Sequence, residues 1–108
     1  MTTTLIKEKV DIEEIVKIIT EQYGPVEKIL LFGSEARGDA DEYSDLDLIV
    51  IKKDVPQNFV KRLGEVPMLP VHADIFVYTP DEFELMKEHE NPFIMSALES
   101  AKIIYEKS

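Results

Sequence analysis

The sequence predicts an α/β or α+β domain in which helices pack on a small sheet. Three segments rich in branched apolar residues have the length of strands, namely residues 26–32, 45–51 and 71–78. Helical patterns alternate with these strands, and residues 103–105 can form a short closing strand. The predicted order is helix, strand, strand, helix, strand, helix, helix, and we expect the helices to lie on one face of the sheet.

The first predicted helix begins after Asp11, whose side chain can cap it, and Glu14 three residues later has the spacing of a capping box. Apolar residues then recur at helical spacing, at Ile12, Ile15, Val16 and Ile19. Gly24 and Pro25 end the helix. The strand at 26–32 follows, and its last four residues are apolar on both faces, as expected of a central strand.

The second strand carries two aspartates that share one direction. Side chains alternate between the two faces of a strand, so Asp45 and Asp47 point the same way. Gly33 ends the preceding strand, residues 34–38 can form one helical turn, and the polar residues 39–44 predict a loop. A tight turn is therefore expected beside two carboxylates.

The second half of the chain predicts a helix, a strand and two more helices. The helix at 56–66 is expected to bury an apolar stripe formed by Phe59, Val60, Leu63 and Val66. Asp74 lies within the strand at 71–78, where a carboxylate is costly unless it meets a cation or lies at an accessible rim. The last two helices begin at Thr79-Pro80 and Asn91-Pro92, which pair a capping residue with proline at the first helical position.

Composition excludes several classes of function. The 108 residues fit a single domain spanning 1–108, and 22 acidic against 12 basic residues give a net charge of −10. Such a charge argues against a protein that grips a nucleic-acid backbone. The absence of cysteine excludes disulfides and thiolate metal sites. The apolar runs are too short to span a membrane and the N-terminus lacks the apolar core of a signal peptide, so a cytoplasmic location is expected.

The aspartates indicate magnesium and phosphate chemistry. Nucleotidyl transfer requires a triphosphate held in line with the attacking hydroxyl and neutralised by divalent metal. Mg²⁺ prefers hard oxygen ligands, and Asp45 and Asp47 supply two from one rigid strand. Asp74 is the only acidic residue of the third predicted strand, so it is the candidate third carboxylate.

The turn after the first strand is the candidate phosphate site. Gly33 allows the backbone to approach phosphate closely, and Ser34 can donate its hydroxyl and its N–H. Arg37 has two alternatives, a contact with phosphate or an ion pair with a local acid such as Asp39 or Asp41.

The two motifs together resemble the signature of a known superfamily. The run Gly33-Ser34-Glu35-Ala36-Arg37-Gly38, followed after five residues by Ser44-Asp45-Leu46-Asp47-Leu48, is similar to that of polymerase-beta-like nucleotidyltransferases. The shortness of the chain resembles the minimal nucleotidyltransferases, which are antitoxin partners of HEPN toxins. Glu35 departs from the pattern, because basic or aromatic residues are common there.

The resemblance implies the fold of that superfamily and a defined reaction. Minimal members bind Mg-ATP and transfer AMP to a tyrosine of the cognate toxin, with which they form a hetero-oligomer. Carried over, Asp45 and Asp47 would bind metal, and Asp74 would bind metal or take the proton from the attacking hydroxyl. The nucleotide would be held by Gly33, Ser34, Arg37 and Ser44.

Two other functions remain open at this point. The same fold can neutralise a toxin by covering its active surface, with no catalysis. Transfer to a small molecule such as an aminoglycoside is a further alternative, although such enzymes usually carry an added helical domain for the acceptor.

Overall fold

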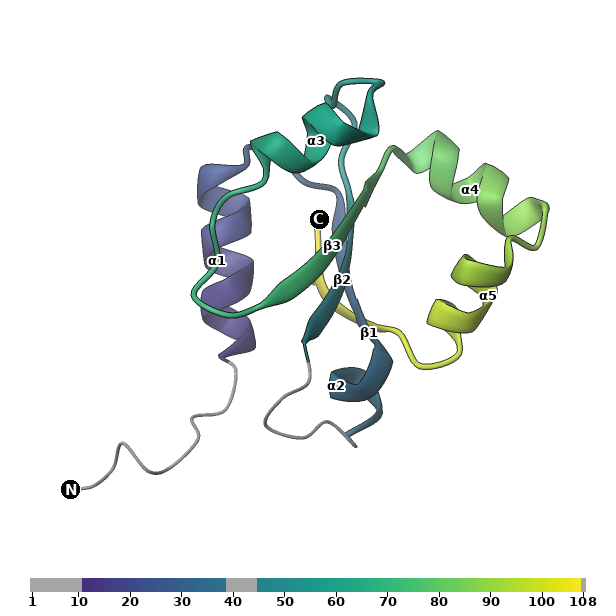
Figure 1. The fold of residues 1–108 in the computed structure, drawn as a ribbon, viewed down its shortest axis with the longest axis horizontal. Coiled ribbons are helices and arrows are strands. Elements are labelled where there is room, and N and C mark those ends of the chain that lie inside the picture. Colours follow the sequence, from purple (N-terminus) through teal and green to yellow (C-terminus); the bar gives the residue numbers. More distant parts are fainter. Residues whose placement is uncertain (1–10, 39–44, 108) are drawn as a thin grey trace.

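The computed structural model describes residues 11–38 and 45–107, which form a four-stranded mixed sheet covered by helices. Strand β1 is antiparallel to both β2 and β4, whereas β3 is parallel to β2, so the sheet order is β3-β2-β1-β4. This arrangement confirms the predicted class, a small mixed sheet with helices packed on it (Figure 1). In chain order the elements are α1 (Ile12–Gln22), β1 (Lys28–Phe32), α2 (Gly33–Arg37), β2 (Leu46–Ile51), α3 (Phe59–Glu65), β3 (Ala73–Tyr78), α4 (Pro80–Glu88), α5 (Pro92–Leu98) and β4 (Lys102–Glu106).

Helices cover both faces of the sheet, and the expectation that they lie on one face is wrong. Ile29 and Leu31 of β1 lie in a core with Ile15 and Ile19 of α1. Side chains of the opposite face, such as Leu30, lie in a second core that α4 and α5 cover. Figure 1 shows α1 on one side of the strands, with α4 and α5 on the other. The two central strands are apolar on both faces, so both faces need a cover.

The predicted helix starts agree with the observed caps. The Asp11 side chain accepts a hydrogen bond from the backbone N–H of Glu14 at 3.2 Å. Thr79 and Glu82 form a complete capping box at the start of α4, and the Asn91 side chain caps α5. These interactions involve residues at most three apart, which is why sequence alone predicts them.

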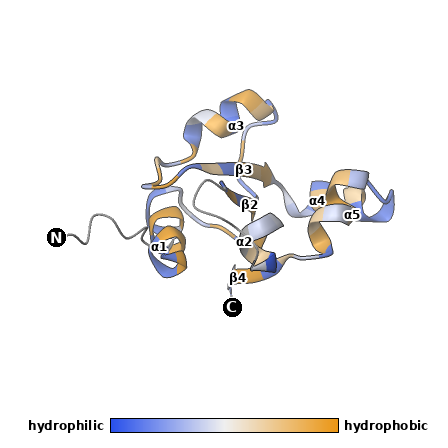
Figure 2. Cartoon of the chain, turned by 60° about the horizontal axis from the view of Figure 1, so that its bottom comes forward, coloured by the Kyte–Doolittle hydropathy of each residue, from blue (hydrophilic) through white to orange (hydrophobic). Residues whose placement is uncertain are grey.

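Helix α3 is shorter than predicted, and of its predicted apolar stripe only Val66 packs against the core. Its side chains Phe59, Val60 and Leu63 are 54%, 78% and 56% exposed, whereas Arg62 is only 2% exposed. The helix lies beside the edge strand β3 and not over a face of the sheet, because α1, α4 and α5 already cover both faces (Figures 1 and 2). Sequence reasoning missed this outward apolar surface.

None of the helices in residues 11–38 and 45–107 is long and apolar enough to cross a bilayer.

Candidate active site

Two of the predicted site aspartates face each other on neighbouring strands. In the parallel pairing of β2 with β3, the register partner of Asp47 is Asp74. Register partners of a parallel pair project from the same face, so the two carboxylates lie side by side. Asp45 directly precedes β2 and is exposed.

The pKa of Asp47 reflects its burial and the negative charges of the neighbouring aspartates. Its pKa is raised above the ordinary value, first because burial desolvates the carboxylate and then because the charges of Asp74 and Asp45 oppose its ionisation. The positive charge of Arg37 lowers the pKa in part. A cation at this position would relieve the repulsion among the three carboxylates.

The glycine turn lies directly against the Asp47 carboxylate. Gly33 follows β1 and is the first residue of α2, with φ of 75°, a left-handed conformation that favours glycine. A Cβ atom at this position would collide with Oδ2 of Asp47 and lie 3.2 Å from its Cγ. The close approach therefore requires glycine twice over, for its backbone angle and for its missing side chain.

The other predicted nucleotide-binding residues lie on or near α2. Ser34 follows Gly33 in the first turn and is half-buried, and Arg37 in the last turn is exposed. The helix packs against β1 and β2, at the end of the sheet where β2 begins (Figure 1). Ser44 lies outside the described residues.

The carboxylate oxygens of the aspartates suit a hard cation that is also bound by substrate phosphates. Carboxylate oxygens are the donors that Mg²⁺ prefers, and this ion usually completes its shell with substrate phosphates and water. Across the described chain, no three or more histidine, aspartate or glutamate side chains are arranged as a ready-made metal site. The aligned pair Asp47 and Asp74 supplies carboxylate oxygens from two neighbouring strands.

An aromatic cluster borders the carboxylates on the same face. Phe32 is the register partner of Asp47 on β1, and Phe76 follows Asp74 by two residues. Phe93 of α5 packs on both rings, with centroid separations of 5.7 Å to Phe32 and 4.8 Å to Phe76. Alternation along the strand predicts that Phe76 lies on the same face as Asp74. No local sequence pattern predicts that Phe93 lies near the site, because tertiary packing brings it there.

The sequence is similar to those of known nucleotidyltransferases. The sequence pattern of the nucleotidyltransferase domain matches residues 12–105. A Methanocaldococcus jannaschii protein, named as a candidate protein adenylyltransferase, is 36% identical over 85 residues, which cover 73% of this chain and 58% of the relative. A second protein of that organism, named likewise, is 33% identical over 95 residues, which cover 87% of this chain and 94% of the relative. The chain thus spans little more than half of the first relative and nearly all of the second.

Two solved structures share the fold. One is a toxin–antitoxin structure with AMP-PNP, with a TM-score of 0.64 at 18% identity, covering 92% of this chain and 76% of the other. The other is a candidate nucleotidyltransferase from Sulfolobus solfataricus, with a TM-score of 0.56 at 21% identity, covering 88% of this chain and 77% of the other. With the family pattern extending across the sheet and its acidic strand pair, the chain belongs to the nucleotidyltransferase domain family, as a minimal nucleotidyltransferase of the polymerase-beta-like superfamily.

Proposed function

We propose that the protein transfers AMP from ATP to a tyrosine hydroxyl of a partner protein, a HEPN-type toxin that it thereby neutralises. The observation that carries the proposal is the alignment of Asp47 with Asp74 directly beside the Gly33 turn. The names of the two Methanocaldococcus relatives support protein adenylylation, and the toxin–antitoxin neighbour with AMP-PNP supports a nucleotide and a protein partner.

Each residue has a role in this reaction. The acceptor hydroxyl oxygen attacks the α-phosphorus of ATP, the bond from that phosphorus to the bridging oxygen breaks, and pyrophosphate leaves. Asp74 takes the proton of the hydroxyl, while Gly33, Ser34, Arg37 and Ser44 hold the nucleotide. Asp45, Asp47 and Asp74 would hold Mg²⁺, which when bound supplies charge neutralisation at the phosphates.

Mass spectrometry of the partner tests the proposal. The purified protein is incubated with its partner and Mg-ATP, and the partner is then weighed. We expect mass increments of AMP that require divalent metal and disappear in Asp47→Ala. A partner that stays unmodified at full metal and ATP would contradict the proposal.

A second candidate function is neutralisation by binding alone. The exposed apolar side chains of α3 favour it, since such a surface can cover a partner without chemistry. A partner that is inhibited equally by the wild type and by Asp47→Ala, without a change in mass, would support this alternative.

A further inference from the structure

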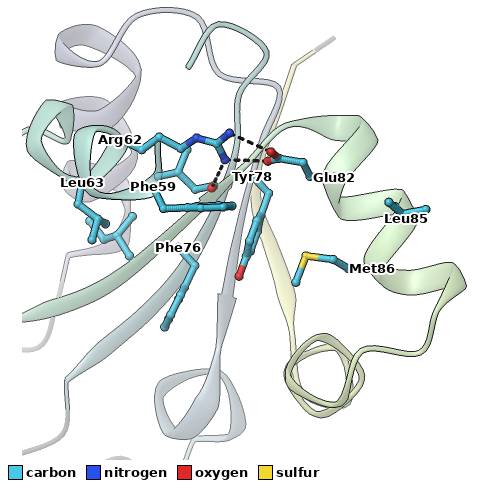
Figure 3. A pocket seen from close by; sticks show the side chains of 10 residues that line it. Phe59, Arg62, Leu63, Phe76, Tyr78, Glu82, Leu85 and Met86 are labelled. Carbon is cyan, nitrogen blue, oxygen red and sulfur yellow. Dashed lines mark hydrogen bonds and ion pairs between the residues drawn. The ribbon is translucent and has the colours of Figure 1, made fainter. Parts of the chain in front are cut away.

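A cavity of about 500 Å³ opens where α3 and α4 meet the edge strand β3. Its wall is mostly apolar, and Figure 3 shows the side chains that line it, among them Phe59, Leu63, Phe76, Tyr78, Leu85 and Met86. Of these residues only Phe76 also borders the acidic site described above. The cavity therefore needs its own explanation.

The cavity continues the acidic site along one strand. Asp74, Phe76 and Tyr78 alternate along β3, so all three project from the same face of the sheet. At about 3.3 Å per residue, the two aromatic side chains lie roughly 7 and 13 Å beyond the carboxylate. An extended peptide whose hydroxyl side chain reaches Asp74 would place a residue about two to four positions away in the cavity.

Hydrogen bonds from Arg62 join α3, β3 and α4 at the cavity wall. The buried Arg62 donates to both carboxylate oxygens of Glu82 at 2.7 and 2.8 Å, and to the carbonyl of Val77 at 3.1 Å. Its guanidinium carbon lies 4.3 Å from the ring centroid of Phe59. Figure 3 shows Arg62 bridging to Glu82 above the rings of Phe59 and Tyr78.

The mouth of the cavity is apolar, and helix α4, which lines one side of it, carries more acidic than basic residues. Leu63 and Leu85 are 56% and 55% exposed, so water contacts a surface that association would bury. Helix α4 also exposes Asp81 and Glu88, in a chain of net charge −10. This charge disfavours a second copy of the chain or an anionic ligand, and it favours an apolar segment with basic flanks.

We propose that the cavity binds an apolar side chain of the protein acceptor, in a segment with basic flanks, about two to four residues from the hydroxyl that receives AMP. The inference rests on the proposed function, because it gives that reaction its acceptor-binding site. Apolar contact at the cavity selects the segment, and the spacing along β3 selects the hydroxyl.

Synthetic peptides test the spacing. Each carries one tyrosine and flanking lysines, with a Leu-Phe pair placed three residues from the tyrosine, ten residues from it, or replaced by two serines. AMP transfer is followed by mass spectrometry, and binding without ATP by fluorescence anisotropy. We expect the three-residue peptide to have a KM about tenfold below that of the other two. Glutamate flanks in place of lysine are expected to weaken binding further.

Surface variants test the location. Leu63→Ser combined with Leu85→Ser removes apolar contact at the mouth, and both side chains are more than half exposed, so folding should persist. Ile103→Ser is the matched control, because Ile103 is 54% exposed on β4, at the opposite edge of the sheet. The double variant should raise the peptide KM about tenfold while kcat and the KM for ATP stay unchanged, and the control should behave as wild type.

The outcomes separate this inference from the proposed function. Equal KM values for the three lysine peptides, or an unchanged double variant, would overturn the inference while AMP transfer stands. Peptide binding that the double variant loses, with no AMP transfer by the wild type to either the peptides or the partner protein, would support the cavity as a docking site and contradict the proposed function. Dimerisation that the double variant abolishes would assign the cavity to a second copy and overturn the inference.

Discussion

Strand β3 has a charged cluster near each of its ends, and the two clusters are built on opposite principles. Near its start, Asp74 faces Asp47, with Asp45 close enough to raise the pKa of Asp47. Near its other end, Arg62 meets Glu82 in a two-point ion pair and also donates to backbone carbonyls of Pro56 and Val77. The second cluster neutralises its own charge, whereas the first leaves like charges facing one another.

The directions of the pKa shifts show that the two clusters have opposite effects on the stability of the fold. Hydrogen bonding from Arg62 holds the pKa of Glu82 below its ordinary value, so ionised Glu82 stabilises the fold. The raised pKa of Asp47 means that its ionised form costs stability. An ion pair that joins α3, β3 and α4 contributes to folding, whereas carboxylates that repel one another are typical of a site that binds a cation.

The largest expected effect is the loss of activity in Asp47→Asn. The amide keeps the shape but removes a charged oxygen ligand, so kcat/KM for AMP transfer should fall on the order of a thousandfold. The melting temperature should nevertheless rise by about 1 to 3 °C at neutral pH, because the repulsion is relieved. Differential scanning calorimetry and the transfer assay measure the two quantities on the same sample.

Magnesium provides the control for that variant. Added Mg-ATP should raise the melting temperature of the wild type more than that of Asp47→Asn, because binding stabilises only the protein that binds. A variant that is both less active and less stable would argue that Asp47 is a structural residue.

Arg62→Met should produce the largest loss of stability. The variant leaves the Glu82 carboxylate and the Val77 carbonyl without their cationic donor, and we expect a loss of about 3 kcal/mol or more in the free energy of unfolding. Denaturant titration measures it. Lys28→Met is the matched control, because Lys28 pairs with Glu106 at 3.5 Å on the surface and should cost less than about 1 kcal/mol. Equal losses would remove the distinction between the two kinds of ion pair.

Gly33→Ala should affect both folding and activity to a smaller extent. The added methyl group meets the Asp47 carboxylate at a left-handed backbone position, so we expect a cost of about 1 to 2 kcal/mol and a fall in kcat of about tenfold to a hundredfold. Gly64→Ala is the control, because it lies in α3 with open space around its Cβ position and should be neutral or slightly stabilising. Full activity in Gly33→Ala would separate the turn from the site.

The smallest expected effects are those of pH on stability. Above its raised pKa, ionised Asp47 costs stability, and this cost disappears as the pH falls toward 3.8, the ordinary value. Ionised Glu82 contributes stability above its ordinary value of 4.5, and the contribution disappears as the pH falls through its lowered pKa.

Two variants separate these pH effects. The stability gain of Asp47→Asn should shrink as the pH falls from neutral to about 4, whereas the loss in Glu82→Gln should persist to lower pH. Melting temperatures measured from pH 7 to pH 3 check both. A gain in Asp47→Asn that grows in acid would contradict the raised pKa.

Features that depend on residues close together in the chain could be predicted from the sequence. The caps at Asp11, Thr79 and Asn91 depend on neighbours within one helical turn, so the residue pattern alone specifies them. Alternation along a strand also predicts that Asp45 and Asp47 share a direction, but the observed strand β2 begins at Leu46, so Asp45 lies just before it.

Long-range pairing decided the rest. The register of β3 against β2 sets Asp74 beside Asp47, and no local pattern specifies that register. The apolar residues of α3 have the spacing of a buried stripe, yet Leu63 remains exposed and Arg62 is buried. A periodic pattern indicates which residues share a helix face. Which face turns inward depends on the space left by the other helices and on the hydrogen-bond acceptors of Val77 and Glu82, which bind Arg62.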